Sequence, residues 1–235
     1  MPYPALPAAA LFDMDGVLVN SNPFHVQKWI ELLEERNIPF DPAAVPGQIL
    51  GKHNDDAFRL YFGSSISPAQ MRQLGAELEA KFRRTFRPHA RALPGLESLL
   101  RELDAAGIKM AVASSAIRDN VEFMVDVLGF RHFFRCLVTG DDVQSPKPSP
   151  EIYLKAARIL DVEPASCVGF EDSPVGIEAV KSAGMKCVAI ASTFSLHELL
   201  HKTRADRVVE GFENLSLENI CGLFTAVESP MRETR

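Results

Sequence analysis

Short apolar runs recur along the chain, and segments with helical spacing of apolar residues separate most of them. The runs with the length and character of buried strands are 8–12, 108–113, 135–139, 166–170, 186–190 and 207–209. Between runs, apolar residues share one helical face, as in the stripe Leu96, Leu99, Leu100 and Leu103, which Gly107 ends. Because strands that alternate with helices form parallel sheets covered on both faces, the pattern predicts an α/β fold with a Rossmann-like parallel sheet as its core.

Residues 20–88 interrupt this alternation. They hold two helical stripes, one around Trp29 and one from Met71 to Phe82, and a loop-rich piece between them, with no convincing strand. We therefore expect a catalytic core of residues 1–19 and 89–235 and an inserted α-helical cap of residues 20–88. The two connections are expected to act as hinges, and closing the cap would exclude water from a site beneath it.

Two Ser-Pro pairs predict helix starts in the second half of the chain. Ser149-Pro150 and Ser173-Pro174 each place a serine where its hydroxyl can cap the helix and a proline at the first helical position. We expect both serines to be N-caps.

Charge and composition narrow the class of protein. The 235 residues carry 25 Lys and Arg against 31 Asp and Glu, a net charge of −6. This balance argues against a general nucleic-acid binder and a basic membrane patch, and no apolar run approaches the ~20 residues of a membrane span. The first residues lack the basic segment of a secretory signal, and the four cysteines contain no C-x-x-C pair. We expect a cytoplasmic protein with reduced thiols, and a monomer by default.

Polar residues follow the predicted strands at the points where these end. Asp13 and Asp15 are two apart on an extended backbone, so both carboxylates leave the first strand on one face, before Gly16 breaks it. Ligands of open α/β sheets bind beyond the carboxyl ends of the strands, so polar groups at the other strand ends converge on the same mouth. These groups are Ser114, Ser115, Lys147, Glu171 and Asp172. Paired carboxylates without cysteine or clustered histidine suit an oxygen-seeking cation, most simply Mg²⁺.

This set of groups can carry out phosphoryl transfer. A carboxylate can attack phosphorus and form an aspartyl-phosphate, while Mg²⁺ offsets the repulsion between two anions. Lys147 would add positive charge, and the Ser114 hydroxyl with backbone N–H groups at the next helix start would hold phosphate oxygens. Asp15 could protonate the leaving oxygen and then activate water.

The four motifs resemble those of the haloacid dehalogenase-like superfamily, in the same order and across essentially the whole core. The matching segments are Phe12-Asp13-Met14-Asp15-Gly16, Ala113-Ser114-Ser115, Ser145-Pro146-Lys147-Pro148 and Gly169-Phe170-Glu171-Asp172-Ser173. The resemblance implies that Asp13 is the nucleophile and Asp15 the acid/base, and that Ser114 and Lys147 bind phosphate. It also implies that Asp13, the Asp15 carbonyl, Glu171 and Asp172 surround Mg²⁺. Dehalogenases of the superfamily lack the second aspartate, whereas Asp15 is present here.

The opening of the chain is similar to the β-phosphoglucomutase-like branch. In that branch, a histidine at the position of His25 helps to position the acid/base aspartate, and a Lys-Gly-x-x-Arg pattern in the cap binds a second phosphate. The aligned segment here is Leu50-Gly51-Lys52-His53-Asn54, so a leucine and an asparagine replace the two cations. The resemblance implies that the substrate contacts His25, Gly51, Lys52, Asn54, Ser115 and Ala116.

These departures favour hydrolysis over isomerisation. Loss of the arginine removes a bidentate fork that Asn54 cannot reproduce, and Lys52 could compensate only as a point charge. A mutase must hold two phosphates, whereas a phosphatase needs one. We therefore expect a Mg²⁺-dependent phosphatase, a phosphoric monoester hydrolase acting on a small phosphorylated metabolite such as a sugar phosphate. The alternatives are a β-phosphoglucomutase-like isomerase and a phosphate-binding regulator without turnover.

Overall fold

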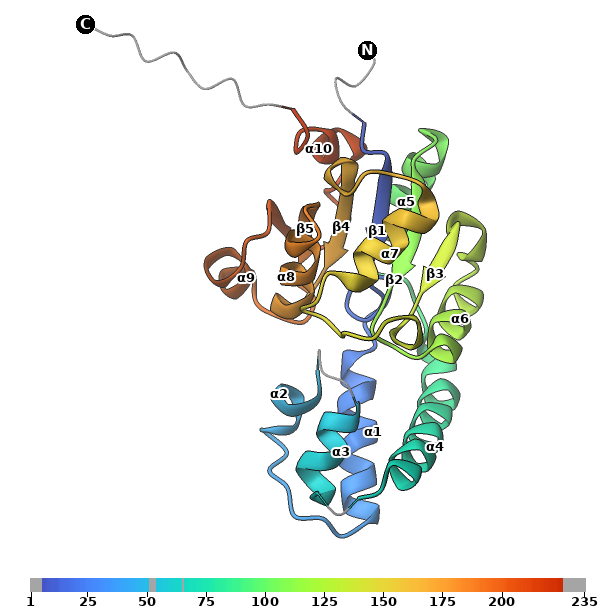
Figure 1. Ribbon diagram of the computed structural model, residues 1–235, viewed down its shortest axis with the longest axis vertical. Coiled ribbons are helices and arrows are strands. Elements are labelled where there is room, and N and C mark those ends of the chain that lie inside the picture. Colours follow the sequence, from blue (N-terminus) through green and yellow to red (C-terminus); the bar gives the residue numbers. More distant parts are fainter. Residues whose placement is uncertain (1–5, 51–53, 65, 226–235) are drawn as a thin grey trace, which may run out of the picture.

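The computed structural model describes residues 6–50, 54–64 and 66–225 of the chain and has two parts (Figure 1). One part is a parallel sheet with helices on both faces, and the other is a group of four helices at one end of it. The strands follow one another in space in the order β3-β2-β1-β4-β5-β6. Their bounds are β1 (Ala9–Phe12), β2 (Lys109–Ala113), β3 (Cys136–Val138), β4 (Cys167–Glu171), β5 (Lys186–Ile190) and β6 (Arg207–Val209).

The strand order reverses at β1, which places the site. Strand β1 pairs in parallel with β2 on one side and β4 on the other, so Leu11 lies opposite both Ala111 and Gly169. All four residues of β1 are buried, as the uninterrupted apolar run predicts for a central parallel strand. The crevice at such a reversal is the usual ligand site of doubly wound sheets.

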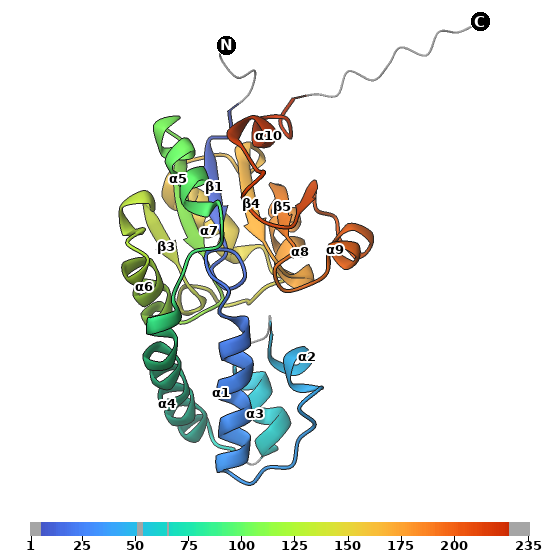
Figure 2. The same cartoon turned by 180° about the vertical axis from the view of Figure 1, so that it is seen from behind.

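Helices cover both faces of this sheet and bury its two apolar layers (Figures 1 and 2). On one face lie α5 (Leu96–Ala105), α6 (Arg118–Val127) and α10 (Leu217–Cys221). On the other face lie α7 (Glu151–Leu160), α8 (Pro174–Ser182) and α9 (Leu196–Lys202). The prediction of an α/β fold with a Rossmann-like parallel sheet is confirmed.

The other helices form the second part, with an apolar cluster of its own. They are α1 (Asn22–Glu35), α2 (Val45–Ile49), α3 (Asn54–Phe62) and α4 (Pro68–Phe86). Trp29 of α1 packs on Phe58 of α3, and Leu78 of α4 is buried in the same cluster. Helix α2 lies within the segment that the sequence predicts to be rich in loops, and α3 begins at the end of that segment. The sequence does not indicate α2, because this helix has only five residues, including Pro46 and Gly47, and shows no helical period. Among the described residues, no helix combines the length and apolar character needed to cross a membrane.

A buried ion pair joins α1 to α4 inside this helical group. The Lys28 Nζ lies 2.8 Å from both carboxylate oxygens of Glu79, and the two side chains are 4% and 7% exposed. Lys81, two residues after Glu79 on α4, offers the contrast: it pairs with Glu31 and Glu35 at the surface and is 30% exposed.

Replacing Lys28 by methionine is expected to destabilise the protein by about 3–5 kcal/mol, because the Glu79 carboxylate would stay buried without a countercharge. The matched change Lys81→Met should cost about 0–1 kcal/mol, as surface ion pairs do. Urea unfolding of both variants measures the difference. Equal losses in the two variants would contradict this account of the Lys28–Glu79 pair.

The two predicted serine caps have different outcomes. Ser173 caps α8 as expected, and its side chain accepts a hydrogen bond from the N–H of Gly176. The prediction for Ser149 is wrong by one residue, because Pro150 is the N-cap of α7. Ser149 lies one residue before it: its N–H donates to the carbonyl of Pro146, and its hydroxyl accepts the N–H of Glu151 at 3.4 Å.

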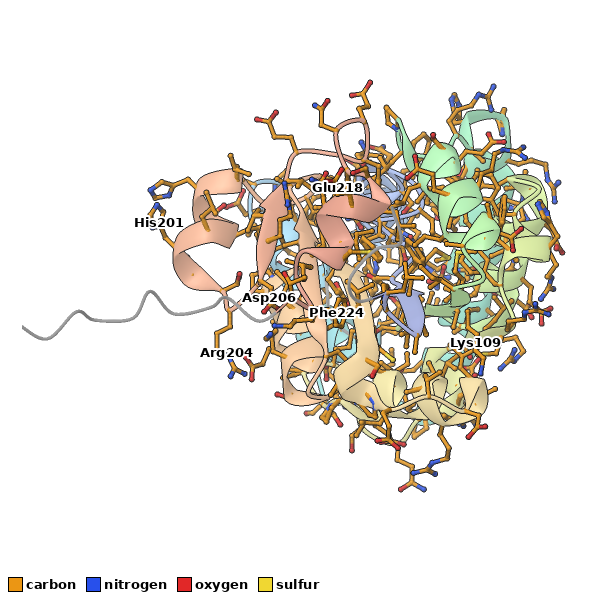
Figure 3. All side chains as sticks on the ribbon, turned by 90° about the horizontal axis from the view of Figure 1, so that it is seen from above. Lys109, His201, Arg204, Asp206, Glu218 and Phe224 are labelled. Carbon is orange, nitrogen blue, oxygen red and sulfur yellow. The ribbon has the colours of Figure 1, made fainter. Side chains whose placement is uncertain are left out.

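The end of the core opposite the helical group is held by charged side chains (Figure 3). The Lys109 Nζ donates to the carbonyl of Leu160, at the carboxyl end of α7, at 2.6 Å. Asp206 pairs with Lys181 at 2.5 Å and also accepts the N–H of Cys187. These contacts hold helix ends against the sheet. They lie far from the candidate site, which is at the carboxyl ends of the strands.

Candidate active site

The ammonium group of Lys147 joins the ends of three neighbouring strands. Its Nζ lies 3.0 Å from Asp13 Oδ1 after β1, 3.0 Å from the Ala113 carbonyl of β2, and 2.6 Å from Glu171 Oε1 of β4. An ammonium has three N–H donors, so these partners use all of them. Burial disfavours the charged lysine, but the carboxylates of Asp13 and Glu171 outweigh that effect and raise the pKa of Lys147. Lys147 therefore stays a cation at the centre of the site.

Three carboxylates meet beside this lysine. Oxygen atoms of Asp13, Glu171 and Asp172 all lie within 4.8 Å of one another, and all three side chains are buried or nearly so. Burial, opposed by Lys147 and reinforced by Glu171 and Asp15, raises the pKa of Asp13 to about 7. Burial and the charges of Asp13 and Glu171 also raise the pKa of Asp172 well above its ordinary value. Crowded carboxylates that one lysine does not neutralise fit a divalent cation with oxygen ligands, as Mg²⁺ prefers.

The crowding also predicts a dependence of stability on pH when no divalent cation is bound. The pKa of Asp13 is raised from 3.8 to about 7, so the folded state favours the protonated carboxyl. This contribution to the free energy of unfolding is present below pH ~4 and is lost as the pH rises to ~7. Relative to the wild type in EDTA, Asp13→Asn should therefore gain stability between pH 4 and 7. Urea unfolding across this range tests the sign, and a constant difference would contradict it.

Asp15 has a different environment from Asp13. Its Oδ1 accepts a hydrogen bond from the Ser21 hydroxyl and lies 3.1 Å from His25 Nε2. Burial acts to raise the pKa of Asp15, but His25 and Ser21 outweigh burial and hold it below its usual value. The two aspartates thus lie in different environments, with Asp13 against a lysine and Asp15 against a histidine and a hydroxyl.

Gly16 lets the chain turn between the two parts of the site. Its φ is +79°, in the left-handed region, and a Cβ there would lie 2.0 Å from Asp172 Oδ2. The glycine therefore allows Asp172 to approach the loop that carries Asp15. After the turn, residues 17–19 are buried, and Val19 pairs with Ala92 on the return connection from the helical group.

A loop after β2 gives the site hydroxyl and backbone groups. Ser114 is buried, its N–H donates to the Val138 carbonyl, and its hydroxyl accepts the N–H of Ala116. Ser115 is exposed, and Ala116 precedes the start of α6 by two residues. Ser114, Ser115 and Ala116 line the same cavity as Asp13.

This cavity measures about 380 Å³ and lies between the strand ends and the helical group. Asp13, Asp15, Lys147 and Asp172 line its core side. Residues of the helical side include Trp29, Ile49, Phe58, Met71, Arg72 and Glu79. The structure thus brings together all the predicted core residues, although Glu171, wholly buried under Lys147, is absent from the cavity wall.

The predicted substrate contacts of the helical group stay predictions, and the structure places only some of their residues. His25 and Asn54 line the cavity, but the Asn54 amide donates to Glu79 at 2.7 Å. Gly51 and Lys52 lie outside the described residues, so their predicted contacts stay predictions.

Known proteins share this architecture. Residues 10–190 match the family model described as "Haloacid dehalogenase-like hydrolase". The chain belongs to this family. The resemblance drawn from the four motifs is therefore confirmed.

Relatives of this hydrolase chain include named phosphatases. It is 32% identical over 209 residues to the chloroplastic 5-amino-6-(5-phospho-D-ribitylamino)uracil phosphatase of Arabidopsis thaliana, covering 88% of this chain and 55% of that protein. It is 33% identical over 193 residues to the validoxylamine A 7'-phosphate phosphatase of Streptomyces hygroscopicus subsp. limoneus, covering 81% of this chain and 88% of that one. The chain thus spans about half the length of the first relative and most of the second.

A solved mutase has a similar fold. The β-phosphoglucomutase of Clostridium difficile superposes with a TM-score of 0.82 and 26% identity, over 93% of this hydrolase chain and 97% of that one.

Sequence reasoning missed several residues of the hydrolase site. Tyr153 donates its hydroxyl to Glu171 Oε1 at 2.6 Å, with its ring 5.1 Å from Lys147 Nζ. Asn22 donates to Thr193 at 2.6 Å and to Asp172 at 3.3 Å. Tyr153 has the sequence pattern of a buried core residue of α7, so its sequence position does not distinguish it. Thr193 follows β5 as the other site residues follow their strands, so strand ends also point to it.

Proposed function

We propose that this chain is a Mg²⁺-dependent phosphatase that hydrolyses the phosphomonoester of a small phosphorylated metabolite, such as a sugar phosphate. The observation that carries the proposal is the set of strand-end groups around Lys147, with Asp13 and Asp15 in separate environments at one cavity. Relatives named as phosphatases support a phosphoric monoester hydrolase. The proposal assigns residues 20–88 to a cap over a core of residues 1–19 and 89–235.

In the proposed reaction, a carboxylate oxygen of Asp13 attacks phosphorus as the bond to the leaving oxygen breaks. Asp15 gives its proton to that oxygen, and a phosphate dianion beside Asp15 favours the protonated form it needs. Asp15 then takes a proton from water, whose oxygen attacks the aspartyl-phosphate and frees Asp13 and inorganic phosphate. The Lys147 ammonium would place its positive charge beside the phosphoryl group, and Ser114 with the N–H groups near Ala116 would bind phosphoryl oxygens.

Asp13, Asp172 and the Asp15 carbonyl would hold Mg²⁺. Glu171 would lie behind these ligands, where it accepts a hydrogen bond from Lys147. When bound, the cation neutralises charge on the phosphoryl group and on its nucleophile. The crowding of Asp13 with Asp172 and their raised pKa values support a cation at this position.

The helical wall of the cavity favours hydrolysis over the mutase reaction. Asn54, in the place of the arginine that binds a second phosphate in mutases, has its amide directed to Glu79. The amide of Asn54 is therefore engaged within the wall, where the Glu79 carboxylate is also paired with Lys28. A single phosphate at the Asp13 end is the better match to this wall.

The decisive experiment measures phosphate release from sugar phosphates, sugar bisphosphates, phosphoglycolate and pyrophosphate, with Mg²⁺ and with EDTA. A parallel assay follows glucose 6-phosphate made from β-glucose 1-phosphate. Release that needs Mg²⁺ and no bisphosphate primer supports the proposal. Glucose 6-phosphate without net release indicates a mutase, and no turnover of any compound indicates the phosphate-binding regulator.

The proposal includes a cytoplasmic monomer whose partner is the small phosphorylated substrate, with no nucleic acid or membrane. The net charge of −6 supports the exclusion of nucleic acid as a general partner. Light scattering tests the monomer, and fractionation of cells tests the compartment.

A further inference from the structure

A buried carboxylate of α4 is shared by three elements. Glu79 accepts hydrogen bonds from Lys28 of α1, from Asn54 of α3 at 2.7 Å and from Asn120 of α6 at 2.7 Å. Lys28 and Asn54 belong to the helical group that carries Glu79, whereas Asn120 belongs to the core. As whole residues, Glu79 is 5% exposed and Asn120 is 2% exposed, so the contact is largely shielded from water although both side chains line the cavity.

The side chain of Asn120 is held from both sides by α4. Its Nδ2 donates to Glu79 Oε2, and its Oδ1 accepts from Arg83 Nη1 at 2.7 Å. A carboxylate can only accept and a guanidinium can only donate, so these two neighbours determine the orientation of the amide. Figures 1 and 2 show the carboxyl end of α4 beside α6, where Arg87 also lies over the ring of Phe123.

The contacts of Asn120 with α4 affect the position of the loop that faces the phosphate in our proposal. Asn120 is in the first turn of α6, and its N–H donates to the carbonyl of Ile117. Ile117 ends the segment 114–117, whose four residues line the cavity.

Glu79 also connects to the acid/base side of the site. Its partner Lys28 has its Nζ 4.9 Å from the ring of Phe82, and His25 stacks on the same ring at 4.1 Å. His25 in turn contacts Asp15. The docked α4 therefore touches both ends of the cavity through named contacts.

We propose that Glu79 and Asn120 form a latch between cap and core, and that Asn120 is a positioning residue for the segment 114–117. Separating α4 from α6 would leave the Asn120 amide without both of its partners and remove one donor from the Glu79 carboxylate. The latch therefore favours the docked arrangement before substrate arrives. This inference rests on the proposed function only for its kinetic test.

The sharpest test exchanges the carboxylate and the amide. Asn120→Asp sets two carboxylates against each other, whereas Glu79→Gln with Asn120→Asp restores an N–H donor and an acceptor with the same total charge. In the double variant, the introduced glutamine would donate to the new carboxylate, which would also accept from Arg83. Asp119→Asn is the matched control, because Asp119 is a 72% exposed neighbour on α6, 3.6 Å from Arg83.

Two readouts are expected to move together. If α4 is docked on α6 in only a fraction of the molecules, the apparent affinity for substrate falls by that fraction. Asn120→Asp should therefore raise KM at least about tenfold and leave kcat within about threefold. The double variant should lower KM again toward the wild-type value, although its stability should fall because Lys28 loses the Glu79 charge. Trp29 is the only tryptophan of the sequence and lines the cavity. Acrylamide should therefore quench its fluorescence more strongly in Asn120→Asp than in the wild type, and as in the wild type in the double variant.

The fluorescence readout needs no turnover, so it separates failure of the latch from failure of the proposed function. If Asn120→Asp does not fold, Asn120→Ser removes both contacts without adding charge and should give the same increase in quenching. The proposal would be overturned if quenching were unchanged in a folded variant of Asn120. It would also be overturned if the defects of the double variant were the sum of those of Glu79→Gln and Asn120→Asp.

Discussion

Asp13→Asn is expected to abolish phosphate release, with kcat/KM falling at least about 10³-fold, or ~4 kcal/mol of transition-state stabilisation. The reason is that an amide cannot take the place of the carboxylate oxygen that attacks phosphorus. Asparagine keeps the volume of the side chain and an oxygen for the Lys147 ammonium, which lies 3.0 Å from Asp13 Oδ1. The change therefore tests the chemistry of the group with little change to its packing.

The measurement is phosphate release by the purified variant at saturating Mg²⁺. The control is its thermal unfolding, which should occur at or above the wild-type temperature in EDTA, because Asp13 is a carboxylate whose burial raises its pKa. A folded Asp13→Asn protein with a tenth or more of wild-type turnover would exclude Asp13 as the nucleophile. It would also favour direct attack by water.

Asp15→Asn is expected to have an effect that depends on the leaving group. With a sugar phosphate, the leaving oxygen needs a proton, and loss of a positioned acid typically costs 10²–10⁴-fold. With p-nitrophenyl phosphate the phenolate leaves without a proton, so the first step should survive in the variant. The second step still needs a base to activate water, so the aspartyl-phosphate should accumulate.

The predicted result is a burst of nitrophenolate of about one equivalent per active site, followed by slow turnover. Intact-protein mass spectrometry should find one added phosphoryl group on Asp15→Asn and none on the double variant Asp13→Asn/Asp15→Asn. His25 and Ser21 contact only Oδ1 of Asp15 among the contacts described above, so their hydrogen bonds can adjust to an amide. Equal losses for both substrates, without a burst, would contradict the acid/base role.

The sheet and its site residues could be predicted because their signals are local. The expected strands agree with the observed ones to within a residue at each end, as for 186–190 and 207–209. A central parallel strand must be apolar along its whole length, and a polar residue that follows it must lie at its carboxyl end. Asp13, Lys147 and Asp172 could therefore be assigned to one place before any fold was known.

Contacts between distant elements could not be predicted in this way. Glu79 has the pattern of a polar position on an amphipathic helix, and nothing near it in sequence indicates that Lys28, Asn54 and Asn120 meet its carboxylate. Tyr153 has the pattern of an ordinary core residue of α7 until its hydroxyl is seen on Glu171. Such partners are 18 to 51 residues apart in the chain and meet only through packing.

The family, the parallel sheet and the carboxylates, lysine and hydroxyls at its strand ends can be read from the amino-acid sequence alone, because each follows from short-range pattern and residue chemistry. The tertiary structure decided how those groups differ: burial raises the pKa of Asp13, while His25 and Ser21 lower that of Asp15. It also decided that Glu79 faces the cavity and accepts hydrogen bonds both from the helical group and from α6. The physical reason is that pKa values and hydrogen-bond partners depend on the distances and burial that packing creates, whereas strand periodicity does not.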